Sequence, residues 1–102
     1  MPNQKNKEPL TLRIITPDEP MREISCEALR LTVKDDRNGR GGGLYGIHPG
    51  HAPALIALGC GEFTATADGK TVLRATTGEG FVRIERDRVT VTTESIDMAP
   101  VE

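Results

Sequence analysis

Hydrophobic and polar side chains alternate with a period of two along most of this chain from residue 10 onward. Leu10, Leu12 and Ile14 fall on one side of the first such segment, with Thr11 and Arg13 on the other. The same alternation recurs in segments 29–34, 63–67, 82–84 and 89–91. Because successive side chains of a strand point to opposite faces, each segment predicts a β-strand with one buried face.

The chain shows no convincing helical spacing in any window of ten residues, and 11 glycines and 7 prolines interrupt it at short intervals. Short alternating segments separated by turn residues are typical of all-β sandwiches and barrels. We therefore predict an all-β fold, a flattened β-sandwich or barrel of about eight to ten strands.

Three turns are predicted from residue chemistry. Asp68-Gly69 lies between two alternating segments and is a strong hairpin signal, and a further turn is expected near Arg86-Asp87. Pro49-Gly50 suits the centre of a type II turn, with proline at the second position and a positive-φ glycine at the third. Ala52 precedes Pro53 and is expected to be extended. The segment 46–53 therefore predicts a rigid surface turn that leads into an edge strand and presents side chains to a partner.

The chain is expected to form one domain. Residues 1–9 are polar and unpatterned and are expected to be a disordered tail, residues 10–99 form the β-sandwich, and residues 100–102 form a C-terminal tail. Lys34 to Gly43 is a charged stretch ending in three glycines, which predicts a mobile loop. It is either a long hairpin connection or a contact loop, since binding residues concentrate on loops.

Charge and hydropathy exclude several classes of protein. The chain has 13 basic and 15 acidic residues, and a net charge of −2 does not indicate binding to nucleic acid or to an anionic membrane surface. It lacks a run of about 20 apolar residues, so no direct membrane insertion is expected. Its first nine residues lack the apolar core of a signal peptide. Cys26 and Cys60 are widely spaced, which favours free buried thiols over a disulfide.

None of the candidate catalytic, metal and cofactor sites in the sequence has the residues that its chemistry requires. His48 and His51 are separated by Pro49-Gly50 and have no third ligand nearby, so we expect contact or structural histidines and no metal. The glycines of 39–43 have no Gly-Lys-Ser/Thr ending and no helix behind them, so no phosphate loop is expected. Residues 35–46 lack the final Glu of a calcium loop. We expect no catalytic residue and no cofactor.

Residues 44–55, Leu-Tyr-Gly-Ile-His-Pro-Gly-His-Ala-Pro-Ala-Leu, resemble the G-I-x-P-G-H-A-P-L-L signature of the epsilon subunit of F-type rotary ATP synthases. Segments 12–17, 28–33, 77–84 and 88–94 are similar to other strands of that family and follow in the same order. The resemblance covers residues 10 to 99. It implies a non-catalytic rotor subunit of the central stalk, which links the gamma shaft to the c-ring and couples ion transport to ATP synthesis or hydrolysis.

The resemblance also implies two sets of contact residues. Those expected at the gamma subunit are Thr16, His51, Ala52, Pro53, Leu55 and Ile56. Those expected to face the polar loops of the c-ring are Asp35, Asp36, Arg37, Arg40, Leu44 and Tyr45. Residues 54–58 are apolar without alternation, which is more than one buried face requires, and Ile56 is expected to face outward toward the partner. The implied location is peripheral, on the cytoplasmic face of the inner or plasma membrane, within the ATP synthase complex.

Two departures from the family pattern limit what the resemblance implies. Typical members continue into a C-terminal pair of helices that can inhibit ATP hydrolysis and sometimes bind ATP, and this sequence stops at Glu102 without such a pattern. The loop before Leu44 also lacks the acidic residue that members often have there. Two other readings stay open: a stand-alone cytosolic β-sandwich that binds a ligand, and a metal-dependent jelly-roll enzyme.

Overall fold

The computed structural model describes residues 9–34 and 43–101. Residues 1–8, most of the predicted tail, lie outside the described residues, as do Asp35, Asp36, Arg37 and Arg40 of the predicted ring-facing loop. The described residues form nine strands: β1 (Leu10–Thr16), β2 (Glu19–Cys26), β3 (Ala28–Val33), β4 (Leu44–Ile47), β5 (Ala54–Ala67), β6 (Lys70–Thr77), β7 (Gly80–Glu85), β8 (Arg88–Thr93) and β9 (Ile96–Ala99). The predicted all-β fold is confirmed.

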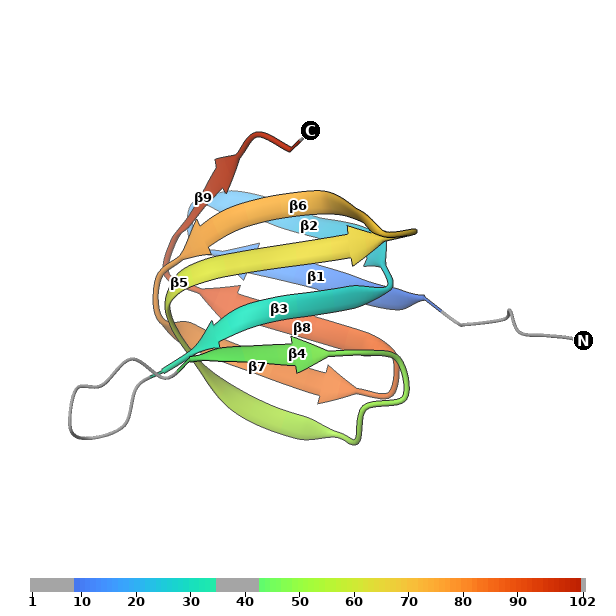
Figure 1. Cartoon of the computed structure of the whole chain (residues 1–102). Coiled ribbons are helices and arrows are strands. Elements are labelled where there is room, and N and C mark those ends of the chain that lie inside the picture. The colour runs from blue at the N-terminus through green and yellow to red at the C-terminus, as the bar shows by residue number, and fades with distance from the viewer. Residues whose placement is uncertain (1–8, 35–42, 102) are drawn as a thin grey trace, which may run out of the picture.

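The strands form two packed layers. Strands β2, β1, β8, β7 and the first part of β5 follow one another in one layer, and β4, β3, the second part of β5, β6 and β9 make the other. Figure 1 shows β3, β4, the second part of β5 and β6 in front of β1, β2, β7 and β8. All described pairings are antiparallel except that of β1 with β8. The sheet is therefore a sandwich whose layers are joined through β5.

The core lies between the layers and is filled by the predicted alternating positions. Leu12, Ile14, Val82, Ile84, Val89 and Val91 are buried from one layer, and Leu29, Leu31, Phe63, Ala65, Leu73 and Ala75 from the other. Their burial removes apolar surface from water, the main favourable term in folding. Phe63 is the largest of the fully buried side chains.

Strand β5 passes from one layer to the other at Gly59 to Gly61. Residues 54–58 pair with β7, whereas residues 61–67 pair with β6. A Cβ atom at Gly61 would lie 2.5 Å from Thr32 Oγ1, and its φ of +154° is one that other residues rarely adopt. Glycine is therefore required where β5 passes close to Thr32 of its neighbour β3 as it changes layer. The first residues of β5, 54–57, pair with β7 alone among the described strands, which agrees with the predicted edge position.

The predicted turns are present. Asp68 and Gly69 both have positive φ, 54° and 74°, as a two-residue type I′ hairpin requires. Gly50 has φ of +85°, and the His51 N–H donates to the His48 carbonyl at 3.2 Å, which closes the turn around Pro49-Gly50. Arg86 also has positive φ, 56°, in the turn between β7 and β8. The hairpins are therefore encoded locally.

Two expectations are corrected by the structure. Residues 54–58 do alternate in burial: Leu55 and Ala57 are exposed, while Ile56 is half-buried and packs against the core. Ile56 therefore faces inward. Cys26 is buried, but Cys60 is exposed, because it lies at the outer bend of β5; both thiols are free. Burial raises the pKa of the Cys26 thiol to about 11, with the hydrogen bond from Ala28 opposing and the charge of Glu27 adding to the shift.

Candidate functional site

An apolar patch covers the outer face of the layer that contains β7. Leu55 is 70% exposed, Phe81 59% and Ile15 39%, and Ala57 is exposed as well. The register explains why they gather: Ala57 is opposite Phe81, Phe81 is opposite Thr92, and Thr92 is opposite Ile15. Side chains directly opposite on neighbouring strands share a face. We call Ile15, Leu55, Ala57 and Phe81 the apolar face.

A shallow hollow of about 340 Å³ continues the apolar face beyond Phe81. Its lining includes Ile15, Thr16, Pro17 and Thr92. Glu79 and Glu94 also line it and give that end an acidic border. On the other side, Arg83 is paired with Leu55 in the ladder and adds an exposed basic group. The apolar face therefore lies between charges of opposite sign.

The structure brings together only some of the residues expected at the gamma subunit. Thr16 borders the hollow beside Phe81, and Leu55 is the most exposed large apolar side chain of the face. Ala52 and Pro53 are exposed and lead into β5, next to the same face. Ile56 points to the core instead. Phe81 and Ile15 were not predicted from the sequence as contact residues. Each is an apolar residue at an outward position of its strand, where alternation leads one to expect a polar side chain.

His51 is held by hydrogen bonds at both ring nitrogens. Its Nδ1 lies 2.7 Å from the Ala52 carbonyl, which can only accept, so Nδ1 carries the proton. Nε2 then accepts from the Tyr45 hydroxyl at 2.8 Å, and the two rings meet edge to face. This arrangement fixes the chain between the Pro49-Gly50 turn and β5. Neither ring nitrogen is free to bind a metal.

Tyr45 was expected to face the ring, but its side chain packs against the core and bonds to His51. Its neighbour Leu44 is 56% exposed and lies at the edge of the described part of that loop. The base of the loop is fixed by two hydrogen bonds, Val33 N–H to the Gly43 carbonyl at 3.0 Å and Lys34 N–H to the Ala57 carbonyl at 2.9 Å. Tyr45 thus anchors β4, and Leu44 is the outward residue.

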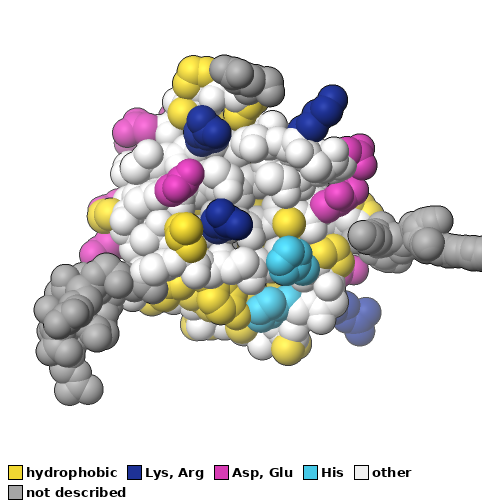
Figure 2. All heavy atoms as spheres, viewed as in Figure 1, with side chains coloured by type: hydrophobic (Ala, Val, Ile, Leu, Met, Phe, Trp, Pro, Cys, Tyr) yellow, Lys and Arg dark blue, Asp and Glu magenta, His cyan; other side chains and the backbone are white. Residues whose placement is uncertain are grey.

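The opposite outer face, formed by β3, β4, β5 and β6, is polar. Figure 2 shows this face with basic and acidic side chains, some apolar side chains and both histidines, which follow the end of β4 in the sequence. Across residues 9–34 and 43–101, no group of three or more His, Cys, Asp or Glu side chains is placed to hold a metal ion. The same described segments contain no helix long and apolar enough to cross a membrane.

Fold and surface together define a small β-sandwich with an exposed apolar face. A family model described as "ATP synthase, Delta/Epsilon chain, beta-sandwich domain" matches residues 9–99. The chain belongs to this family.

Relatives with known names agree with this assignment. The chain is 38% identical over 82 residues to an ATP synthase epsilon chain of Synechococcus sp., and 34% identical over 92 residues to that of Bacillus velezensis. The matches cover 80% and 84% of this chain but only 54% and 64% of those relatives. The chain therefore spans between half and two-thirds of their length.

Solved structures confirm the fold at low identity. A chain in the Euglena gracilis mitochondrial ATP synthase, described as OSCP/F1/c-ring, superposes with a TM-score of 0.74 at 17% identity, covering 94% of this chain and 57% of that one. A chain in the Tetrahymena thermophila mitochondrial ATP synthase, described as central stalk/c-ring, gives 0.64 at 11% identity, covering 88% and 66%.

Proposed function

We propose that this chain is a non-catalytic rotor subunit of a membrane-associated rotary ATP synthase. The β-sandwich joins a gamma-type shaft to the ring of c subunits and transmits rotation between ion transport and ATP turnover. Support comes from family membership, from relatives named as ATP synthase epsilon chains, and from neighbours within central-stalk and c-ring assemblies. We place it peripherally, on the cytoplasmic face of the membrane.

The observation that carries this proposal is the apolar face. Phe81 and Leu55 are 59% and 70% exposed on the outer surface of the sheet, where contiguous apolar area marks a contact with another protein. Two of the residues expected at gamma, Thr16 and Leu55, lie on or beside this face, and Ala52 and Pro53 lead into it. We propose that the apolar face is the gamma interface, with Phe81 as its central anchor.

The charges around the face indicate what gamma presents. Glu79 and Glu94 border one end, and Glu79 is half-exposed even though it pairs with Lys34 at 3.6 Å. Arg83 borders the other side and pairs with Glu85 at 3.5 Å. Complementary charge fixes the orientation of a complex more than its affinity. A basic gamma side chain beside Glu94 and an acidic one beside Arg83 fit this pattern.

The second contact proposed is with the c-ring. It involves the loop that contains Asp35, Asp36, Arg37 and Arg40, residues outside the described segments, together with Leu44 within them. Tyr45 contributes as an internal anchor of β4, because its hydroxyl is bonded to His51. The loop then reaches the ring while its base is fixed to β5 through Lys34.

Binding of purified gamma subunit, measured by calorimetry, tests the interface. Phe81→Asp is expected to weaken binding about 100-fold and Leu55→Asp about tenfold, because a desolvated aromatic anchor dominates an interface. Val72→Asp is the matched control: Val72 is 40% exposed on β6, away from the apolar face, and its replacement is expected to leave affinity unchanged. Unchanged binding of Phe81→Asp, with its circular dichroism spectrum intact, would refute the assignment of this face to gamma.

A further inference from the structure

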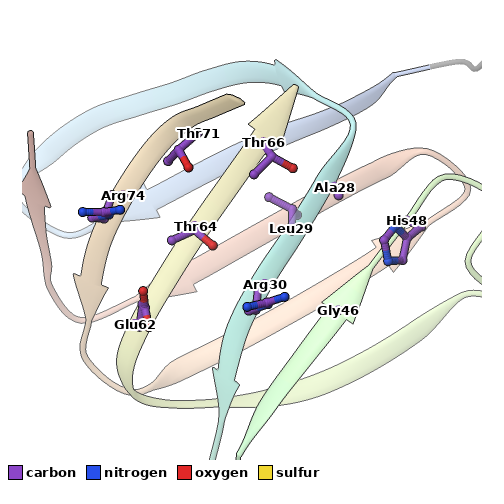
Figure 3. Close-up of a pocket in the computed structure, with 10 residues that line it drawn as sticks. All are labelled: Ala28, Leu29, Arg30, Gly46, His48, Glu62, Thr64, Thr66, Thr71 and Arg74. Atoms are coloured by element: carbon purple, nitrogen blue, oxygen red, sulfur yellow. The ribbon is translucent and has the colours of Figure 1, made fainter. Parts of the chain in front are cut away.

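The polar outer face contains a hollow that the rotor function does not use. It has a volume of about 340 Å³ and is lined from β3, β5, β6 and the residues around the end of β4. Figure 3 shows Arg30, Thr64 and Arg74 on three neighbouring strands, with His48 beyond β4. Residues of four chain segments thus meet at one concave, polar surface.

The two arginines belong to one cross-strand row. Arg30 is opposite Thr64 on β5, and Thr64 is opposite Arg74 on β6. Both arginines are exposed, and neither forms an ion pair with a carboxylate of the described residues. Arg13, Arg22, Lys34 and Arg83 each have an acidic partner within 4 Å, whereas Lys70, Arg86 and Arg88, like the two arginines of the row, have none among the described residues. The row therefore places around a threonine two guanidinium groups that form no ion pair with a carboxylate of residues 9–34 or 43–101; Glu62 lies two positions from Thr64 on the same strand.

Hydroxyl donors fill the space between and beside the arginines. Thr64, Thr66 and Thr71 are half-buried and line the hollow. Thr66 and Thr71 are opposite each other in the ladder, one step along from the arginine row. A threonine hydroxyl donates one hydrogen bond, and a guanidinium donates several in a planar fork that matches oxyanions. The donors in this hollow outnumber its one acidic side chain, that of Glu62.

Gly46 gives the hollow its depth at the β4 side. It is opposite Arg30 in the ladder, and a Cβ atom there would lie 3.7 Å from His48 Nε2. The absence of a side chain leaves room between the Arg30 strand and the His48 ring. The chain has three aromatic residues beside its histidines, Tyr45, Phe63 and Phe81, and none of them lines this hollow. The surface therefore offers hydrogen-bond donors and positive charge beside one carboxylate, that of Glu62, and it has no Phe, Tyr or Trp ring.

We propose that this hollow binds a phosphate-type oxyanion, with Arg30 and Arg74 on two sides, the hydroxyl of Thr64 between them and that of Thr66 two residues further along β5. The phosphate comes either from a small soluble molecule or from the headgroup of an anionic lipid, since both present the same oxygens. Charge-assisted hydrogen bonds from guanidinium groups are the strongest that an exposed site offers. Because the arginines stand on the face opposite Phe81, the site is independent of the proposed gamma interface.

The test is a titration of the full-length, ¹⁵N-labelled chain with inorganic phosphate at constant ionic strength, followed by amide shifts. Saturable shifts are expected at Thr64 and Thr66. Arg30→Ala and Arg74→Ala are each expected to raise the dissociation constant about tenfold. Arg83→Ala, an exposed arginine of the opposite layer, is the matched control and is expected to leave it unchanged.

A second arm uses vesicles with and without phosphatidylglycerol. Saturable binding of inorganic phosphate by a chain that does not sediment with the vesicles supports a soluble ligand. Sedimentation of the chain with phosphatidylglycerol vesicles that is lost in Arg30→Ala and Arg74→Ala supports a lipid headgroup. Amide shifts that grow linearly with phosphate concentration, and that chloride produces to the same extent, would overturn the proposal. So would an equal loss of binding in Arg83→Ala, or no saturable binding to either phosphate source. Unperturbed amide spectra of the variants away from the substitution confirm that each remains folded.

Discussion

The two outer faces of this sandwich have the same backbone design and opposite surface chemistry. On the β7 layer, the outward row Ala57, Phe81, Thr92 and Ile15 is mainly apolar. On the β6 layer, the outward row Arg30, Thr64 and Arg74 is polar and basic. Both rows lie over a core of similar aliphatic side chains. The difference teaches that inward positions specify the fold, whereas outward positions give each face its own surface chemistry.

Strand β5 contributes residues to both outer faces, so the difference between apolar and polar surface chemistry occurs within a single strand. Before the bend at Gly61 its outward residues are Leu55 and Ala57, and after it they are Glu62, Thr64 and Thr66. A change in outward chemistry therefore coincides with the change of layer.

The largest effect is expected from substitutions at neighbouring positions of β5. Ile56→Asp buries a carboxylate against the core and is expected to lower the free energy of unfolding by at least about 3 kcal/mol. Leu55→Asp places the same charge in solvent and is expected to change it by no more than about 0.5 kcal/mol. Urea denaturation followed by circular dichroism measures both. Equal destabilisation by the two variants would mean that Leu55 is not on an outer face.

Much of the fold could be predicted from local sequence. Alternation at Leu10, Leu12 and Ile14 correctly marked a buried face, and Asp68-Gly69 correctly marked a hairpin. These signals depend on strand periodicity and on turn residues, which act over a few positions. The Pro49-Gly50 turn was likewise readable from two residues.

The composition of the two faces was less predictable, because it depends on which strands become neighbours. Nothing local indicates that Phe81 lies opposite Ala57, or that Arg30 and Arg74 share a row through Thr64. The inward position of Ile56 was missed because its neighbours are all apolar, so the run 54–58 gave no contrast from which to assign a face. Cross-strand register is set by the whole sheet.

A smaller effect is expected at the bend that separates the two faces. Gly61→Ala places a methyl group against Thr32, whose hydroxyl donates to the Glu62 carbonyl at 3.0 Å. The alanine must also adopt the φ of +154° at this position, which is strained for any residue with a side chain. The expected cost is about 1–3 kcal/mol. Gly46→Ala, where a Cβ meets nothing closer than 3.7 Å, is the control and is expected to cost no more than about 0.5 kcal/mol. Thermal unfolding measures both, and an equal cost at the two sites would contradict a required glycine at the crossing of β5.

The smallest effect is expected for the difference in affinity between ATP and inorganic triphosphate, because no Phe, Tyr or Trp ring lines the polar face. ATP recognition combines phosphate contacts with a surface on which the base stacks, but Tyr45 packs inward, Phe63 is buried and Phe81 lies on the other face. This 102-residue chain is therefore expected to bind ATP no better than millimolar, which corresponds to no more than about 4 kcal/mol of binding free energy. Inorganic triphosphate is expected to bind within about twofold of ATP, because the adenosine adds no stacking contact. Calorimetry with both ligands measures the ratio. A clear preference for ATP, or micromolar affinity, would show that the polar face or its neighbouring edges hold a base-binding surface and would end the distinction drawn between the two faces.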